Sequence, residues 1–252
     1  MAKALPEPAR VVLMTAALAV LDPDPAQAIC VAAAAALEVS GVGLLLVSGQ
    51  LEANSVGVSN ALAAAVEDVQ YTLGEGPGID AHRMKIPVLA PDLGARETID
   101  WPGFREGAQA VGVHAAFGFP LLVESVCFGA LNLYNDRPGA LTAEQIANAI
   151  AVSFVVSRTV LGWQTTASTG SLAWQLAQMP AHRAVIHQAA GIVSVQAAVT
   201  VSVATTLLRA YAFAEDRPIA VVAEDVVGHV LRFEAGPRDS AYDAATAEIE
   251  EI

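Results

Sequence analysis

Three short helical patterns lie close together between Arg183 and Val227, and each has its own start or stop signal. Gly191 and Thr200 separate the first two patterns, and the third follows Pro218. Thr200 suits a helix N-cap because its hydroxyl can accept a hydrogen bond from an early backbone amide. In the first pattern the apolar side chains recur three and four residues apart, so that they share one face: Val185, Ile186, Ala189, Ile192 and Val193. The segment predicts a small bundle of three helices.

The first part of the chain mixes helical and strand patterns. Helices are predicted over about 8–21 and 26–37, and Asp22 to Pro25 stops the first of them. The short apolar run 42–47 is typical of a buried central strand. A return strand near 53–59 and a helix over 60–69 complete this part.

The middle of the chain is dense in turn residues between Leu73 and Phe104. Two strands are predicted after it, over about 115–123 and 126–134, and residues 124–125 join them at the spacing of a hairpin. Helices, strands and broken loops in this order predict an α+β fold.

Thr142 and Gln145 have the spacing of a capping box, in which each side chain satisfies a backbone amide at the start of a helix. The helix that they open is expected to run to about Trp163. Small polar residues from Thr165 to Ser171 then have the composition of a flexible joint.

Six segments follow one another in the first part of the chain: Gly74-Glu-Gly-Pro-Gly-Ile-Asp80, Pro87-Val-Leu89, Pro91-Asp-Leu93, Trp101-Pro-Gly-Phe104, Phe119-Pro-Leu121 and Gly129-Ala-Leu-Asn-Leu-Tyr134. In their joint order they resemble the GAF domain. The resemblance implies a small-molecule sensor fold, in which a ligand is held between a sheet and broken loops.

In the three-helix segment, Arg183-x-x-Ile-x-Gln-Ala-x-Gly191 is followed by Thr200, by Leu208-Arg-Ala210 and by Val222-Ala-x-x-Val-Val227. This order resembles the ANTAR domain, an RNA-binding module of bacterial transcription antiterminators, and the two domains together resemble actinobacterial GAF–ANTAR regulators. Together the two resemblances cover about residues 10–233. They imply a GAF sensor domain (an antiparallel sheet flanked by helices) followed by a C-terminal three-helix ANTAR domain. We expect these domains over 8–163 and 172–233, with a linker over 164–171 and a flexible acidic tail over 234–252.

The resemblance implies a cytoplasmic, homodimeric antitermination regulator that binds paired RNA hairpins in nascent transcripts. Dimer contacts are expected from the N-terminal helix and from the helix after Thr142. The net charge of −13 repels nucleic acid, so RNA binding requires a local surface. From residue 171 to 233 the chain carries four arginines and four acidic residues, so this segment has no net charge.

The predicted RNA-binding residues are those whose side chains can contact phosphate or bases: Arg183, His187, Gln188, Thr205 and Arg209. Arg209 occupies the arginine position of the family's Leu-Arg-Ala, and a guanidinium can contact a phosphate or stack on a base. Phe213 lies one helical turn after Arg209, on the same side of the predicted helix, and an exposed aromatic ring can stack on an unpaired base. The family usually has a basic residue where this chain has Ala190. The alternative function is therefore a dimeric sensor or scaffold whose ANTAR domain has lost RNA binding and mediates protein association.

The candidate residues of the sensor pocket are Tyr71, Asp92, Trp101, Phe104 and His114, for a small molecule that the sequence does not identify. Each of them also fits plain core or loop packing, as aromatic residues usually do.

Other functional classes find little support in the sequence. No serine–histidine–aspartate order, carboxylate cluster or cofactor fingerprint supports an enzyme or a bound cofactor. The five histidines are dispersed without metal-ligand spacing, and Cys30 and Cys127 lie in apolar surroundings typical of buried thiols. The apolar run from Val11 to Leu21 is too short to span a membrane, and no membrane association is expected.

Overall fold

The computed structural model describes residues 6–18, 24–48, 52–95, 101–166, 181–215 and 217–233. The chain divides into two compact units, Met1–Gln178 and Met179–Ile252. The first residues of the predicted linker belong to a helix that runs to Thr166. The rest of the linker and the predicted acidic tail lie outside the described residues.

A five-stranded sheet forms the centre of the first unit, and every pair of neighbouring strands in it is antiparallel. The strand order is β2-β1-β5-β4-β3. The bounds are β1 Gly41–Ser48, β2 Glu52–Val58, β3 Val88–Ala90, β4 Ala115–Val123 and β5 Val126–Asn135. The predicted hairpin is confirmed as β4 and β5, and Glu124 in its turn has a φ of 55°.

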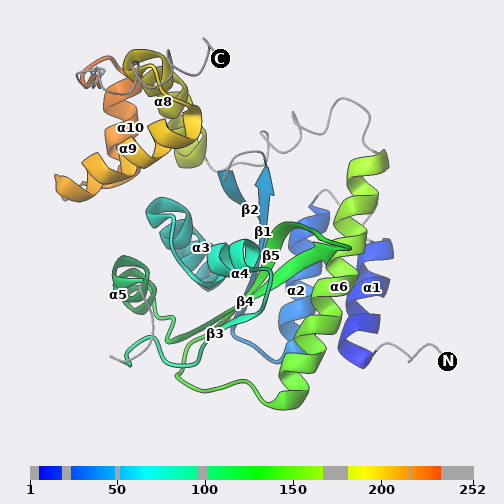
Figure 1. The fold of residues 1–252 in the computed structure, drawn as a ribbon. Helices are drawn as coiled ribbons and strands as arrows, with labels where there is room; N and C mark the ends of the chain where they lie inside the picture. Colours follow the sequence, from blue (N-terminus) through cyan, green and yellow to red (C-terminus); the bar gives the residue numbers. More distant parts are fainter. Residues whose placement is uncertain are drawn as a thin grey trace, which may run out of the picture. The chain divides into compact units, whose positions relative to one another are not determined.

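Two helices, α2 (Pro25–Leu37) and α6 (Ala143–Thr166), cover one face of this sheet, and α1 (Glu7–Leu18) packs on both of them. In Figure 1 these three helices lie to the right of the sheet. Phe117, Phe119 and Leu131 point from the sheet into the core beneath these helices, where Ile29 and Val156 meet them. The burial of apolar side chains between these helices and the sheet is the main interaction that holds the two layers together.

The opposite face is covered by α3 (Ala61–Leu73), α4 (Pro77–Met84) and α5 (Pro102–Ala110). The sequence predicts only the first of these three helices, and α3 extends four residues beyond its expected end. The other two lie in the segment rich in glycine and proline. Each of them has proline near its N-terminus, where the missing amide hydrogen costs no helical hydrogen bond.

Side-chain caps fix several helix starts. Asn60 accepts a hydrogen bond from the backbone of Ala63 at 2.9 Å, which sets the beginning of α3. The predicted capping box is confirmed: the Thr142 amide donates to Gln145 Oε1 at 3.0 Å, and the Gln145 amide donates to Thr142 Oγ1 at 3.1 Å. Such a reciprocal pair satisfies two amides that the helix itself leaves without partners.

The second unit consists, in its described part, of α8 (Ala181–Ala197), α9 (Val201–Ala214) and α10 (Ile219–Val227), as the sequence predicts. The Thr200 hydroxyl accepts from the Val203 amide at 3.4 Å, so the predicted N-cap of α9 is confirmed. The axes of α8 and α9 are bent by 104° at the intervening break. Apart from Thr205, the buried side chains of the three helices are small or aliphatic, among them Ile186, Ala189, Val193, Ala204, Leu208, Val222, Ala223 and Val226.

One helix among the described residues, α6, is long and apolar enough to cross a membrane by length and composition, and α8 with α9 passes the same test as a bent pair. Core helices of soluble proteins also pass it. The side chains of Val152, Val156 and Val160 on α6 are buried in the core against the sheet.

Gly43 on β1 provides a test of the core. A Cβ atom at this position would lie 1.9 Å from Glu67 Oε1, a buried oxygen that cannot move into solvent. We expect Gly43→Ala to lower the free energy of unfolding by about 1–3 kcal/mol, because overpacking displaces the buried carboxylate. The matched control is Gly139→Ala: a Cβ atom there meets nothing within 4 Å, and the change should stay within about 0.5 kcal/mol. Urea denaturation measures both, and equal midpoints would contradict the packing described.

Candidate nucleic-acid interface and sensor site

The predicted RNA-binding residues lie on α8 and α9, in surroundings that differ from one residue to the next. Gln188 is exposed on α8. His187 and Arg209 are half-buried, and both interact with neighbouring groups. Thr205 is buried, and its hydroxyl donates to the Val201 carbonyl at 3.0 Å. Arg183 lies in the first turn of α8, and its side chain is outside the described part of the structure.

Thr205 therefore contributes to the packing of α9 rather than to its surface. Burial at 204, 205 and 208 arises because α9 packs against both α8 and α10, which widens its buried face beyond a single stripe. The spacing of apolar residues in the sequence predicts one buried face of α9 and does not show that a second helix packs against it.

The charges of the three-helix segment, residues 171–233, are balanced in number and partly paired. Arg217 forms an ion pair with Asp225, with 2.5 Å between Nη2 and Oδ2. The hydrogen bond to Asp225 raises the pKa of Arg217 above its ordinary value, so the guanidinium stays charged. Arg232 is exposed, and so are Glu215 and Glu224. No local excess of positive charge arises from these described side chains.

The outer side of α9 is instead an uncharged stripe, defined here as Val203, Thr206, Ala210 and Phe213. Its members are three or four residues apart, so they lie along one side of the helix. All four are exposed, Val203 to 45% and Phe213 to 82%. Phe213 was identified from the sequence as a stacking residue, whereas the other three members were not. Their 3-4-3 spacing is the signal that marks them.

A buried polar cluster lies between α3 and the sheet in the first unit. Glu67 Oε1 accepts hydrogen bonds from Asn132 Nδ2 at 2.8 Å and from the Tyr134 hydroxyl at 2.9 Å. Gln70 Oε1 accepts from the Gly78 amide at 3.0 Å and so joins α3 to α4. All of these side chains are fully buried. The sequence signal for Glu67 and Gln70 is their helical spacing with the apolar Ala63 and Val66, which places them on the inward face.

The predicted sensor-pocket residues divide between the core and the surface. Trp101 and Phe104 meet edge to face, with 5.8 Å between ring centroids, inside the core of α3, α5 and the sheet. Tyr71 is buried on α3, while Asp92 is exposed and its Oδ1 accepts from the Gly94 amide at 2.8 Å. His114 is half-buried, and its backbone amide donates to Asn135. Of the five predicted pocket residues, Trp101 and Phe104 are thus in direct ring contact, and both form part of the packed core.

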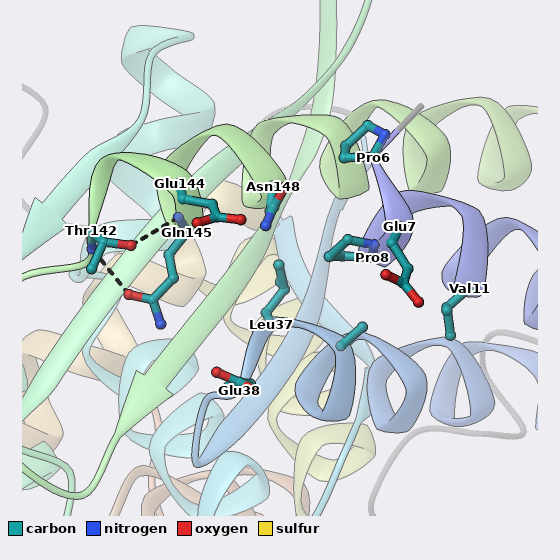
Figure 2. Close-up of a pocket in the computed structure, with 11 residues that line it drawn as sticks. Pro6, Glu7, Pro8, Val11, Leu37, Glu38, Thr142, Glu144, Gln145 and Asn148 are labelled. Atoms are coloured by element: carbon teal, nitrogen blue, oxygen red, sulfur yellow. Dashed lines mark hydrogen bonds between the residues drawn. The ribbon is translucent and has the colours of Figure 1, made fainter. Parts of the chain in front are cut away.

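A cavity of about 640 Å³ lies among α1, α2 and α6, on the side of the sheet away from α3. Figure 2 shows the residues that line it. Its walls come from the start of α1, the end of α2 and the start of α6, where the capping box of Thr142 and Gln145 forms one side. Among the described residues, three carboxylates line it, those of Glu7, Glu38 and Glu144, and no basic side chain does. No predicted pocket residue reaches this cavity.

Both cysteines have environments that disfavour the thiolate. Burial raises the pKa of Cys30 well above its ordinary value, and the nearby charges of Glu67 and Asp24 raise it further. Burial also raises the pKa of the half-buried Cys127. Since the thiolate is the reactive form, neither residue is suited to nucleophilic or redox chemistry at neutral pH.

Comparisons with known proteins agree with this architecture. Residues 174–227 match the family model of the ANTAR domain. The GAF domain of an Acinetobacter phosphoenolpyruvate-protein phosphotransferase is similar in structure, with a TM-score of 0.50 at 15% identity over 65% of this chain and 96% of that chain. Two further structures have lower TM-scores. The free methionine-R-sulfoxide reductase from Neisseria meningitidis has 0.47, at 14% identity over 66% of this chain and 96% of that chain. The GAF domain of a Coxiella burnetii phosphoenolpyruvate-protein phosphotransferase has 0.45, at 12% identity over 63% and 97%.

No curated protein matches the chain. The strand topology, the GAF-domain similarity and the ANTAR match together confirm the α+β architecture that the sequence predicts. A GAF-fold unit is followed by a segment, residues 174–227, that matches the ANTAR domain. RNA binding and transcription antitermination are the properties of the ANTAR family.

Proposed function

We propose that this protein is an RNA-binding transcription antitermination regulator of the actinobacterial GAF–ANTAR type, without catalytic activity, which acts in the cytoplasm. The observation that carries the proposal is the match of residues 174–227 to the ANTAR domain, in a unit that folds into the three expected helices. The exposed uncharged stripe of α9 supports it, because this side of the bundle is open to a partner.

The proposed target is a pair of RNA hairpins in a nascent transcript. A homodimer would present two ANTAR domains, and binding of the first hairpin would raise the effective concentration of the second domain at the other hairpin. The bound hairpins would exclude the competing terminator. The GAF unit would supply dimerisation and would set the spacing of the two ANTAR domains in response to a small molecule.

The apolar exposed side of α6 favours dimerisation through this helix. Ile150 is 48% exposed and Phe154 52%, and Leu161 follows two turns later. The guanidinium of Arg158 lies 5.9 Å from the centroid of the Phe154 ring, so that its charge borders this surface. A second α6 packed here would remove the apolar side chains from water.

A second candidate function is protein association by an ANTAR domain that has lost RNA binding. The balanced charges of residues 171–233 and the apolar members of the stripe favour it. Measuring RNA affinity separates the two functions.

RNA binding by wild-type protein tests the proposed function directly. The probe is a paired-hairpin RNA selected on the full-length protein from a library with random loop sequences. We expect Arg209→Ala to weaken binding by about five- to 150-fold, because a contacting arginine contributes about 1–3 kcal/mol. Arg209→Lys restores the charge without the planar donor geometry and should recover only part of the affinity.

The matched control is Arg137→Ala, which removes the same charge from an exposed loop of the first unit. It should leave the affinity unchanged, and thermal melting should show that all variants are folded. Failure of selection to yield any RNA that the wild-type protein binds would support protein association instead.

The dimer makes a separate prediction. Light scattering after size-exclusion chromatography should give the mass of two chains for the wild type and of one chain for Phe154→Arg, because the new guanidinium would face Arg158 and its copy across the interface. Val126→Arg is the control, since Val126 is 61% exposed on the β4–β5 hairpin. A Phe154→Arg variant with the dimer mass would show that α6 is not the interface.

A further inference from the structure

Phe213 is the most exposed phenylalanine among the residues that the structure describes. Phe104, Phe117 and Phe119 are at most 1% exposed and Phe154 is 52% exposed, whereas Phe213 is 82% exposed. Its neighbour Tyr211 packs edge to face on Phe233, with 5.5 Å between centroids. The ring of Phe213 therefore remains exposed near the end of α9, where it can receive a planar group.

The remainder of the stripe is flat and uncharged. Ala210 and Thr206 are small, and Val203 ends the row about 15 Å from Phe213, at 1.5 Å per helical residue. A planar group stacked on Phe213 would meet no bulky side chain of the stripe along α9.

Apart from Arg209, which is half-buried one turn before Phe213, the described charges around the stripe are poorly suited to holding a phosphate backbone. Arg217 is paired with Asp225, and Glu215 at the end of α9 is exposed. Duplex RNA presents mainly phosphates and 2′-hydroxyls, whose binding needs a local excess of cations. An unpaired base presents an uncharged π-face, and stacking it on an aromatic ring contributes about 1–3 kcal/mol.

We infer that Phe213 is the base-stacking residue of this protein and that the stripe of α9 receives unpaired nucleotides of an RNA loop. The inference rests on the proposed RNA-binding function and makes it specific: the recognised chemistry is an unstacked base, and phosphate contacts are secondary. Recognition of this kind is less sensitive to salt than binding by a basic patch.

The test uses the full-length protein and the selected paired-hairpin RNA, with 2-aminopurine placed at one loop position after another. One loop position should change its fluorescence on binding wild-type protein. Phe213→Leu keeps an apolar side chain without the ring, and it should lose this signal and bind about five- to 150-fold more weakly. Phe213→Trp should retain both, since it keeps a stacking face. Val195→Ala is the control, because Val195 is also 82% exposed but lies on α8, and its affinity should equal that of wild type.

The outcomes separate this inference from the proposed function. Wild-type protein that binds no RNA would overturn both. Wild-type binding that Phe213→Leu leaves intact would overturn the stacking role and leave the regulator standing. A Phe213→Leu variant that changes the mass of the protein in light scattering, with RNA affinity unaltered, would show that the stripe is an interface between protein chains. A steep loss of affinity with salt, matching many phosphate contacts, would also contradict the inference.

Discussion

Close packing of three short helices determines what the second unit can present to a partner. Ala204, Leu208 and Ala212 of α9 are turned inward, and small or aliphatic side chains of α8 and α10 meet them. With this face buried, the stripe from Val203 to Phe213 has to lie on the outside. Helices this short owe their stability mainly to packing, so the core and the recognition surface are consequences of the same arrangement.

The first unit has a comparable constraint at Glu67. Its carboxylate ties α3 to β5 through Asn132 and Tyr134, and Gln70 ties the same helix to the start of α4. A buried carboxylate is tolerated where hydrogen bonds compensate for the loss of water. The chain's own side chains thus occupy part of the space between the sheet and its loops. The cavity lined by Glu7, Glu38 and Glu144 lies among the helices on the other face.

Local signals in the sequence predicted much of this structure. The β4–β5 hairpin, the capping box at Thr142 and the N-cap at Thr200 were identified correctly, because each depends on residues within a few positions of one another. The helices α4 and α5 were missed, because their glycines and prolines are typical of turns. Contact with the sheet stabilises α4: a Cβ atom at Gly118 of β4 would lie 2.2 Å from the Pro77 carbonyl.

The candidate sites were harder to predict, because burial depends on neighbours that are distant in sequence. Thr205 has the polarity of a contact residue, yet α9 has two neighbouring helices, and this residue lies between them. Trp101 and Phe104 were both named as candidate pocket residues, but whether they line a pocket or fill a core depends on α3 and the sheet. Spacing alone placed Phe213 on the same side of the helix as Arg209, whereas its exposure beside Val203, Thr206 and Ala210 depends on how the three helices pack.

The central claim is that the outer side of α9 carries RNA recognition in an otherwise acidic protein. Hydrogen exchange of the full-length chain, measured by mass spectrometry with and without the selected RNA, tests it most directly. The account predicts that RNA slows exchange in peptides from residues 201–214, with any further protection elsewhere in the ANTAR domain. Protection confined to the GAF-fold unit, or none in α9 at saturating RNA, would contradict it.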